Sequence, residues 1–248
     1  MALEIALMIV GGLIGVVGIV AGIVSIWLSI QYMRYNRRTC SSGMTGEETA
    51  RAVLDANGLH HIRVSVTGSV LFGNSYSHYF KKVRLRRFTK HKQSITAVGM
   101  GAQKAALAIL AKEDDPDMRR RIRLVPLITF GPFAFVPLIL IGFLLDYFVF
   151  QSSGYCTLLL AGFSVIFYVY SIILSVSTLK TEKKAQERAY EILAQKHFLH
   201  ADELTDLRGL FRLYKIQYIN DIIISSLEML RFVLQLVIQV KNGELIKK

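Results

Sequence analysis

Acidic residues and cysteines are scarce in this chain. Its 248 residues contain 18 Asp and Glu against 30 Lys and Arg, which gives a net charge of +12. This balance suits a protein that faces anionic lipid or an acidic partner. The two cysteines, Cys40 and Cys156, lack metal-ligand spacing and fall in different compartments on the topology below. We therefore expect two unpaired thiols.

Several catalytic motifs are also missing. No Ser-His-Asp set stands out, and no internal repeat is evident. Gly11-Gly12 and Gly99-x-Gly101 lack the further glycine and the strand context of a phosphate-binding loop. The sequence thus offers no motif for triad-based or nucleotide-dependent catalysis.

Long apolar runs are what the chain has in abundance. It is 52% hydrophobic, with a mean hydropathy of +0.40. A bilayer is crossed by about 20 apolar residues, and we predict membrane spans at 5–33, 124–150, 156–179 and 216–240. The first run has no positive n-region and no small-residue cleavage site, which favours an uncleaved anchor over a signal peptide.

The positive charges predict the orientation. Arg34, Arg37 and Arg38 follow the first run, and Arg119, Arg120, Arg121 and Arg123 precede the second. Because cytoplasmic loops carry excess Lys and Arg, we expect the N-terminus outside and residues 34–123 and 180–215 in the cytoplasm. Lys241, Lys247 and Lys248 would then lie outside, against the usual bias.

The segment 39–123 has the pattern of a small soluble α/β region. Thr45 and Glu48 form a capping box before a helix that Asn57-Gly58 ends. Alternation predicts strands at 61–66 and 81–88, with turn residues between them. Ser94 is a predicted N-cap for a helix over 94–112, whose small residues suit close backbone contact.

A basic segment runs through the second predicted strand. We expect Lys82, Arg84 and Arg86 on one strand face, and expect them, with Arg87, Arg119, Arg120 and Arg121, to face anionic headgroups of the cytoplasmic leaflet. Nucleic-acid binding, with stacking on Phe80 and Phe88, is the less favoured interpretation.

Charged residues also occur inside the fourth apolar stretch. Glu228 and Arg231 are three residues apart and are expected to pair on one helix face. Charges within a membrane are usually paired or functional. For these two residues we therefore favour a packing role and a partner-binding site equally, and an ion path less.

Specific motifs bring a family resemblance, and the clearest of them runs from Ser41 to Leu59. Ser42-Gly43-Met44-Thr45-Gly46, followed by Ala50-Arg51, Leu54 and Asn57-Gly58-Leu59, resembles the opening motif of the YugP-like membrane neutral zinc metallopeptidases. Similar family segments are Lys82-Val83-Arg84-Leu85, Ser94-Ile95-Thr96-Ala97-Val98, Thr178-Leu179-x-x-Glu182 and Leu227-Glu228-Met229-Leu230-Arg231.

The resemblance implies a zinc site that the sequence has lost. The family continues into His-Glu-x-x-His, where two histidines bind zinc and the glutamate polarises its water. Here those positions hold Gln103, Lys104 and Leu107, while Glu182 falls on a later acidic residue of the family. We hypothesise that Lys104 takes the metal position and offsets the charge of Glu182.

The resemblance and the missing residues lead to one favoured hypothesis. We expect a mainly α membrane protein of about four transmembrane helices with a small cytoplasmic α/β zincin-like insertion. It would be an inactive peptidase homologue of a bacterial plasma membrane, without zinc, that binds membrane lipids and protein partners or further copies of itself, but no nucleic acid.

Two alternatives remain open at this stage. The first is an active peptidase with a relocated metal site, for which His78, His91, His197, His200 and Glu182 are available. The second is a small transporter or channel component that uses Glu228 and Arg231.

Overall fold

The apolar runs and the α/β segment of the sequence fold into two compact units. The computed structural model describes residues 2–67, 73–151 and 154–241. One unit, which we call the helical unit, takes its described residues from 1–25, 123–177 and 218–248. The other, the mixed unit, takes 26–122 and 178–217. Four helices, Ala2–Arg37, Pro116–Leu144, Tyr155–Gln195 and Ala201–Lys241, contribute residues to both units.

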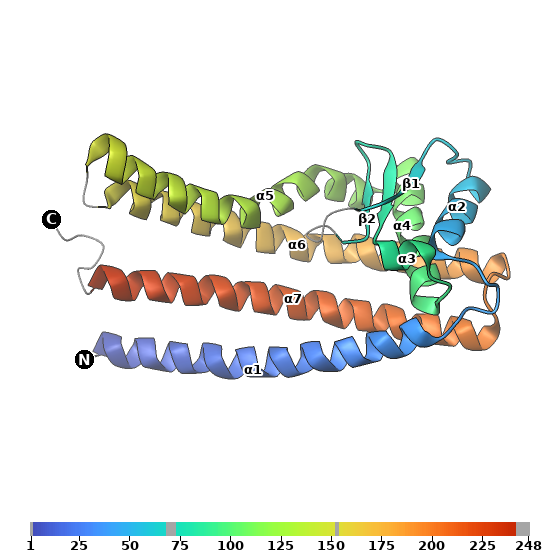
Figure 1. Ribbon diagram of the computed structural model, residues 1–248, viewed down its shortest axis with the longest axis horizontal. Helices are drawn as coiled ribbons and strands as arrows, with labels where there is room; N and C mark the ends of the chain where they lie inside the picture. Colours follow the sequence, from blue (N-terminus) through green and yellow to red (C-terminus); the bar gives the residue numbers. More distant parts are fainter. Residues whose placement is uncertain (1, 68–72, 152–153, 242–248) are drawn as a thin grey trace. The chain divides into compact units, whose positions relative to one another are not determined.

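Helices make up most of the described chain (Figure 1). The elements are α1 Ala2–Arg37, α2 Gly46–Ala56, β1 Arg63–Val66, β2 Ser75–Ser77, β3 Lys82–Leu85, α3 Arg87–His91, α4 Ile95–Lys112, α5 Pro116–Leu144, the π-helix η1 Leu145–Phe150, α6 Tyr155–Gln195 and α7 Ala201–Lys241.

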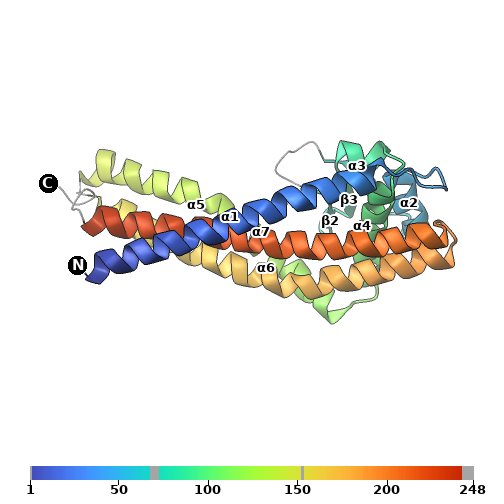
Figure 2. The ribbon, with the colours of Figure 1, turned by 90° about the horizontal axis from the view of Figure 1, so that it is seen from below.

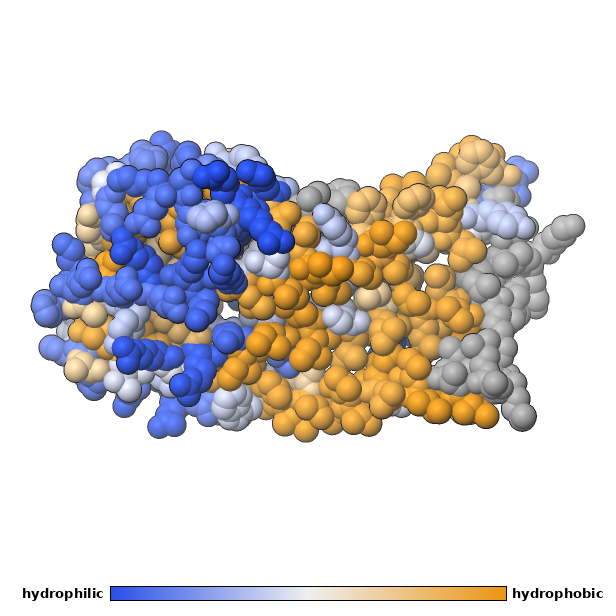
Figure 3. Space-filling model, turned by 180° about the vertical axis from the view of Figure 1, so that it is seen from behind, coloured by the Kyte–Doolittle hydropathy of each residue, from blue (hydrophilic) through white to orange (hydrophobic). Residues whose placement is uncertain are grey.

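The helical unit exposes apolar side chains, and its part of Figure 3 is mainly hydrophobic on the face shown. In the described ranges two helices are long and apolar enough to cross a membrane, Met8–Arg37 and Tyr155–Gln195, and Ala134–Phe150 is a shorter apolar helix. The expected spans 124–150 and 216–240 are helical but are not among those two.

Polar groups and rings fix the contacts within the helical unit. The Asn220 side-chain amide of α7 donates to the Ser25 hydroxyl of α1 over 2.8 Å. The Phe135 ring of α5 meets Phe232 of α7 edge-on at 4.7 Å between centroids. Asp146 is buried and accepts hydrogen bonds from the backbone N–H groups of Cys156 and Thr157. It therefore caps α6.

The mixed unit contains a three-stranded sheet in the order β1-β3-β2. β1 pairs with β3 in parallel, and β2 pairs with β3 antiparallel. Val83 and Leu85 of β3 are fully buried, whereas Lys82 and Arg84 lie on the other face. Two sequence predictions needed correction: Ser75–Ser77 forms a strand where a turn was expected, and the strand expected to reach Phe88 ends at Leu85 because α3 follows.

Helix α4 lies at the centre of the mixed unit, with the sheet, α2 and α3 gathered around it (Figures 1 and 2). From Ile95 to Leu110 every residue except Met100 is buried. The expected caps are present, since the Ser94 side chain accepts from the Ala97 N–H and Thr45 with Glu48 forms the capping box of α2. A Cβ on Gly101 would overlap the Gly46 carbonyl oxygen. Glycine therefore allows α2 and α4 to touch backbone to backbone.

Residues 180–215, whose mixed charges predict a helical segment, belong to two helices in the structure. The first part continues α6 to Gln195, and α7 begins at Ala201. His197, with φ of +54°, lies in the turn between them. Ion pairs join this part of α6 to the loop after α4: Lys184 reaches Asp115 at 2.7 Å, and Arg188 reaches Glu113 at 2.9 Å.

Candidate functional site

Two polar side chains interrupt the apolar surface of α4. Gln103 is 3% exposed and Lys104 is 8% exposed, within a helix otherwise made of Ala, Gly, Leu, Ile and Val at its buried positions, apart from Thr96. A buried ammonium is unfavourable unless it is paired and hydrogen-bonded. The buried Lys104 ammonium therefore needs an anionic partner from another element.

That partner is Glu182 of α6. Its Oε2 accepts from the Lys104 Nζ at 3.1 Å and from the Gln103 Nε2 at 3.0 Å. The pairing of Lys104 with Glu182 was expected from the sequence and is confirmed. It joins residues 78 positions apart in the chain.

The sequence did not predict the fourth member of the site. Arg121 of α5 donates from Nη2 to the Glu182 Oε1 at 2.7 Å, and its side chain is only 14% exposed. The prediction that Arg121 faces lipid headgroups is therefore wrong. An arginine beside a membrane boundary looks like a topology signal, and only the fold shows that it turns inward to a carboxylate.

The two cations control the ionisation of Glu182. Burial by itself would raise the pKa of this carboxyl, but the charges of Lys104 and Arg121 outweigh it and lower the pKa to about 2. One carboxylate thus faces two basic side chains, an ammonium and a guanidinium group, so cationic groups outnumber the carboxylate. The Gln103 Oε1 and the Arg121 Nε are buried without a hydrogen-bond partner.

The residues present do not fit the zinc ion that the sequence resemblance implies. Zinc is bound by imidazole, thiolate or carboxylate groups, and catalytic sites usually supply three. Lys104 and Arg121 already engage both Glu182 oxygens, and Leu107 is fully buried in the apolar core. Among the described residues, no group of three or more His, Cys, Asp or Glu side chains is placed to hold a metal.

The histidines considered for a relocated site lie apart from this cluster. His78 packs edge-on against Tyr76, while His91, His197 and His200 are exposed. Burial and the nearby Lys81 lower the pKa of His78.

The motif around Ser41 is held by Glu203, near the start of α7. The Ser41 N–H and hydroxyl donate to its two carboxylate oxygens, each at 2.6 Å, and the His200 N–H donates to the same carboxylate at 2.9 Å. Burial would raise the pKa of Glu203, but these donors lower it. Glu203 therefore caps α7 and anchors the loop before α2 at once.

The other predicted basic residues stay at the surface of the mixed unit. Arg86, Arg87, Arg119 and Arg120 are exposed, while Lys82 and Arg84 are partly exposed. Arg119 pairs with Asp114. The Arg84 guanidinium lies 5.3 Å from the centre of the Phe80 ring.

Glu228 and Arg231 lie together on a groove in the helical unit but, among the described side chains, form no salt bridge with each other. Both side chains are exposed. The ion pair expected from their spacing is not formed between the described side chains. The groove has a volume of about 690 Å³, and Gly11, Gly15, Gly18 and Gly22 of α1 form its other wall.

These features define a mainly helical protein with two candidate membrane spans and a small sheet beside a buried central helix. Residues 10–237 match the family described as "Putative neutral zinc metallopeptidase", and the chain belongs to that family. It is 27% identical, over 203 residues, to the "Putative membrane protease YugP" of Bacillus subtilis (strain 168), a match that covers 82% of this chain and 85% of that protein. No solved structure matches it.

Proposed function

We propose that this chain is a catalytically inactive member of its family that acts by binding, as a scaffold or partner subunit in the membrane. The observation that carries the proposal is the Lys104–Glu182 ion pair, whose residues occupy the positions at which the sequence resemblance implies the family's catalytic motif and a later acidic residue. An ammonium has no lone pair for a proton at neutral pH, so Lys104 cannot act as the general base.

The charge of the cluster adds to the argument. Its two cations repel a divalent metal, and its one carboxylate accepts hydrogen bonds from Gln103, Lys104 and Arg121. The cluster ties α4, α5 and α6 together, so the former catalytic position would now serve stability.

Metal content is the first measurement. The detergent-purified chain, prepared without chelators, is analysed by elemental mass spectrometry beside a family member that retains His-Glu-x-x-His. We expect stoichiometric zinc only in the second protein, and casein hydrolysis only by the second protein. One zinc per chain in the wild-type protein would overturn the proposal and favour a relocated site.

We also propose a membrane topology for the chain, that of a bacterial multi-pass plasma-membrane protein. Spans at 5–33, 124–150, 156–179 and 216–240 would place 34–123, with its zincin-like α/β region, and 180–215 in the cytoplasm. The arginines before residue 124 support this orientation. In a background in which Cys40 and Cys156 are replaced by serine, Glu113→Cys should then resist an impermeant maleimide in intact cells, and Gln151→Cys should react.

A second candidate function rests on the groove of the helical unit. Glu228 and Arg231 line it beside the glycines of α1, which suits a small transporter or channel component. Flux through proteoliposomes that falls in Glu228→Gln, with normal folding, would favour this function over the binding role.

A further inference from the structure

One face of the small sheet carries only cations and serines. The register places Arg63 of β1 opposite Lys82 of β3, and Ser65 opposite Arg84. On the other side, Ser77 and Ser75 of β2 lie opposite the same two cations. Partners in a sheet point to the same side, so these six residues share the face opposite buried Val83 and Leu85. We call this the cationic sheet face: Arg63, Ser65, Ser75, Ser77, Lys82 and Arg84.

Without a bound anion, this arrangement of charges destabilises the sheet. Like charges directly opposite one another on neighbouring strands are destabilising. Within the described part of the chain, Arg63, Lys82 and Arg84 form no salt bridge, whereas Arg51, Lys184 and Arg188 of the same unit each pair with a carboxylate. An anion supplied from outside would relieve the repulsion.

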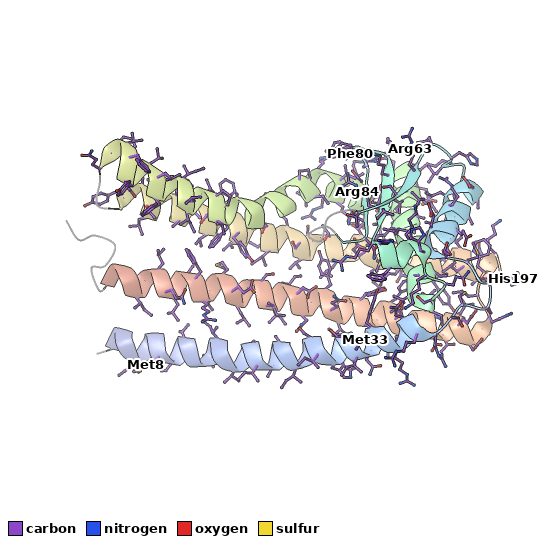
Figure 4. All side chains as sticks on the ribbon, viewed as in Figure 1. Met8, Met33, Arg63, Phe80, Arg84 and His197 are labelled. Atoms are coloured by element: carbon purple, nitrogen blue, oxygen red, sulfur yellow. The ribbon has the colours of Figure 1, made fainter. Side chains whose placement is uncertain are left out.

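An exposed aromatic ring stands beside these cations. Phe80 is 66% exposed, although its side chain is large, and the preceding Tyr79 is 69% exposed. Arg84 lies over the Phe80 ring, and Figure 4 shows Arg63, Phe80 and Arg84 together at the sheet. Aromatic rings next to cations are typical of protein surfaces at the headgroup level of a bilayer.

We infer that the cationic sheet face binds the phosphate groups of anionic lipid headgroups. The mixed unit is covalently continuous with both candidate membrane spans, so it meets headgroups at high effective concentration. Guanidinium, ammonium and hydroxyl groups together supply the donors that phosphate accepts. Nucleic acid is the weaker partner, since strand binding needs successive stacking platforms, and in the described part of the chain Phe80 is the single ring that lies against these cations. The inference holds whether or not the chain is a peptidase.

The wild-type protein allows a direct test. It is reconstituted in nanodiscs of phosphatidylcholine, with or without phosphatidylglycerol, and treated with phenylglyoxal, which modifies accessible arginines. Mass spectrometry should show Arg63 and Arg84 protected only with phosphatidylglycerol, while exposed Arg212 reacts equally in both. Equal modification of Arg63 and Arg84 in the two nanodiscs would overturn the inference.

A fluorescent variant gives an independent measurement. Trp27→Phe with Phe80→Trp leaves one tryptophan beside Arg84. Its emission should shift to the blue, and brominated lipid should quench it, only when phosphatidylglycerol is present. Adding Arg63→Ser and Arg84→Ser should abolish both effects, whereas the charge-matched control Lys196→Ser with Arg212→Ser should keep them. A shift produced instead by an oligonucleotide in phosphatidylcholine nanodiscs would assign the face to nucleic acid.

Discussion

Glu203 holds Ser41 with both oxygens of its carboxylate, although 162 residues separate the two in the chain. The contact joins the family motif before α2 to the first turn of α7. One side chain thus performs two tasks, helix capping and loop anchoring, and its loss should affect both.

Glu203→Ala should lower the unfolding free energy by about 2 kcal/mol, because it removes a helix cap and two charge-assisted hydrogen bonds from Ser41. Thermal unfolding of the purified protein measures the loss. Asp202→Ala is the matched control, since Asp202 is exposed in the same helical turn. Equal losses in the two variants would show that the Ser41 contact contributes nothing.

The Lys104–Glu182 pair should show strong thermodynamic coupling. Lys104→Ala leaves a partly buried carboxylate with one cation fewer and should destabilise the fold by about 3 kcal/mol. The double variant with Glu182→Ala should recover part of that loss. Thermal unfolding of the wild type, both single variants and the double variant completes the cycle, and additive effects would contradict the coupling.

Arg121 and Arg120 are neighbours with opposite expected behaviour. Arg121→Gln should destabilise the protein by about 2 kcal/mol, because it removes a charged hydrogen-bond donor from Glu182. Arg120→Gln, at an exposed position, should be close to neutral. Unfolding midpoints in the same detergent decide between this assignment and a shared role for the two arginines at the membrane surface.

Acid should weaken the cluster within a defined pH window. The folded-state pKa of Glu182 is about 2, below its ordinary value of 4.5. Its ionised form therefore stabilises the fold fully above about pH 4.5, and this contribution is lost as the pH falls toward 2. Melting temperatures of Glu182→Gln should depend less on pH over this window than those of the wild type. Glu187→Gln, on the exposed side of α6, should behave like the wild type.

Backbone contact between α2 and α4 leaves no room for a methyl group. Gly101→Ala should destabilise the fold by about 3 kcal/mol or prevent folding, because the new Cβ would overlap the Gly46 carbonyl. Gly162→Ala, where a Cβ meets no atom within 4 Å, is the control. A stable Gly101→Ala protein with normal secondary structure would mean that the two helices do not pack so closely.

Local signals predicted local structure well. The capping box of Thr45 with Glu48 and the Ser94 cap placed the starts of α2 and α4, because a cap depends on a few neighbouring residues. β2 was missed, since Ser75 and Ser77 are turn-forming residues that become a strand only by pairing with β3.

The site was predictable only where a family motif reached it. The resemblance supplied positions 103, 104 and 182, and charge complementarity suggested their contact. Arg121 and Glu203 had no such signal, because each meets its partner through a fold that brings distant segments together. The cationic sheet face was foreseen in part: strand alternation put Lys82 and Arg84 together, but only the parallel register adds Arg63.

The cluster around Glu182 also restricts how the sequence can change. Replacing Lys104 alone with glutamate would set two carboxylates against each other, with only Arg121 to balance them. Introducing a single histidine at 103 or 107 would bury a polar ring without a metal to satisfy it. Each single substitution toward His-Glu-x-x-His is thus expected to destabilise the fold, so that the motif could be built here only by changing several residues together.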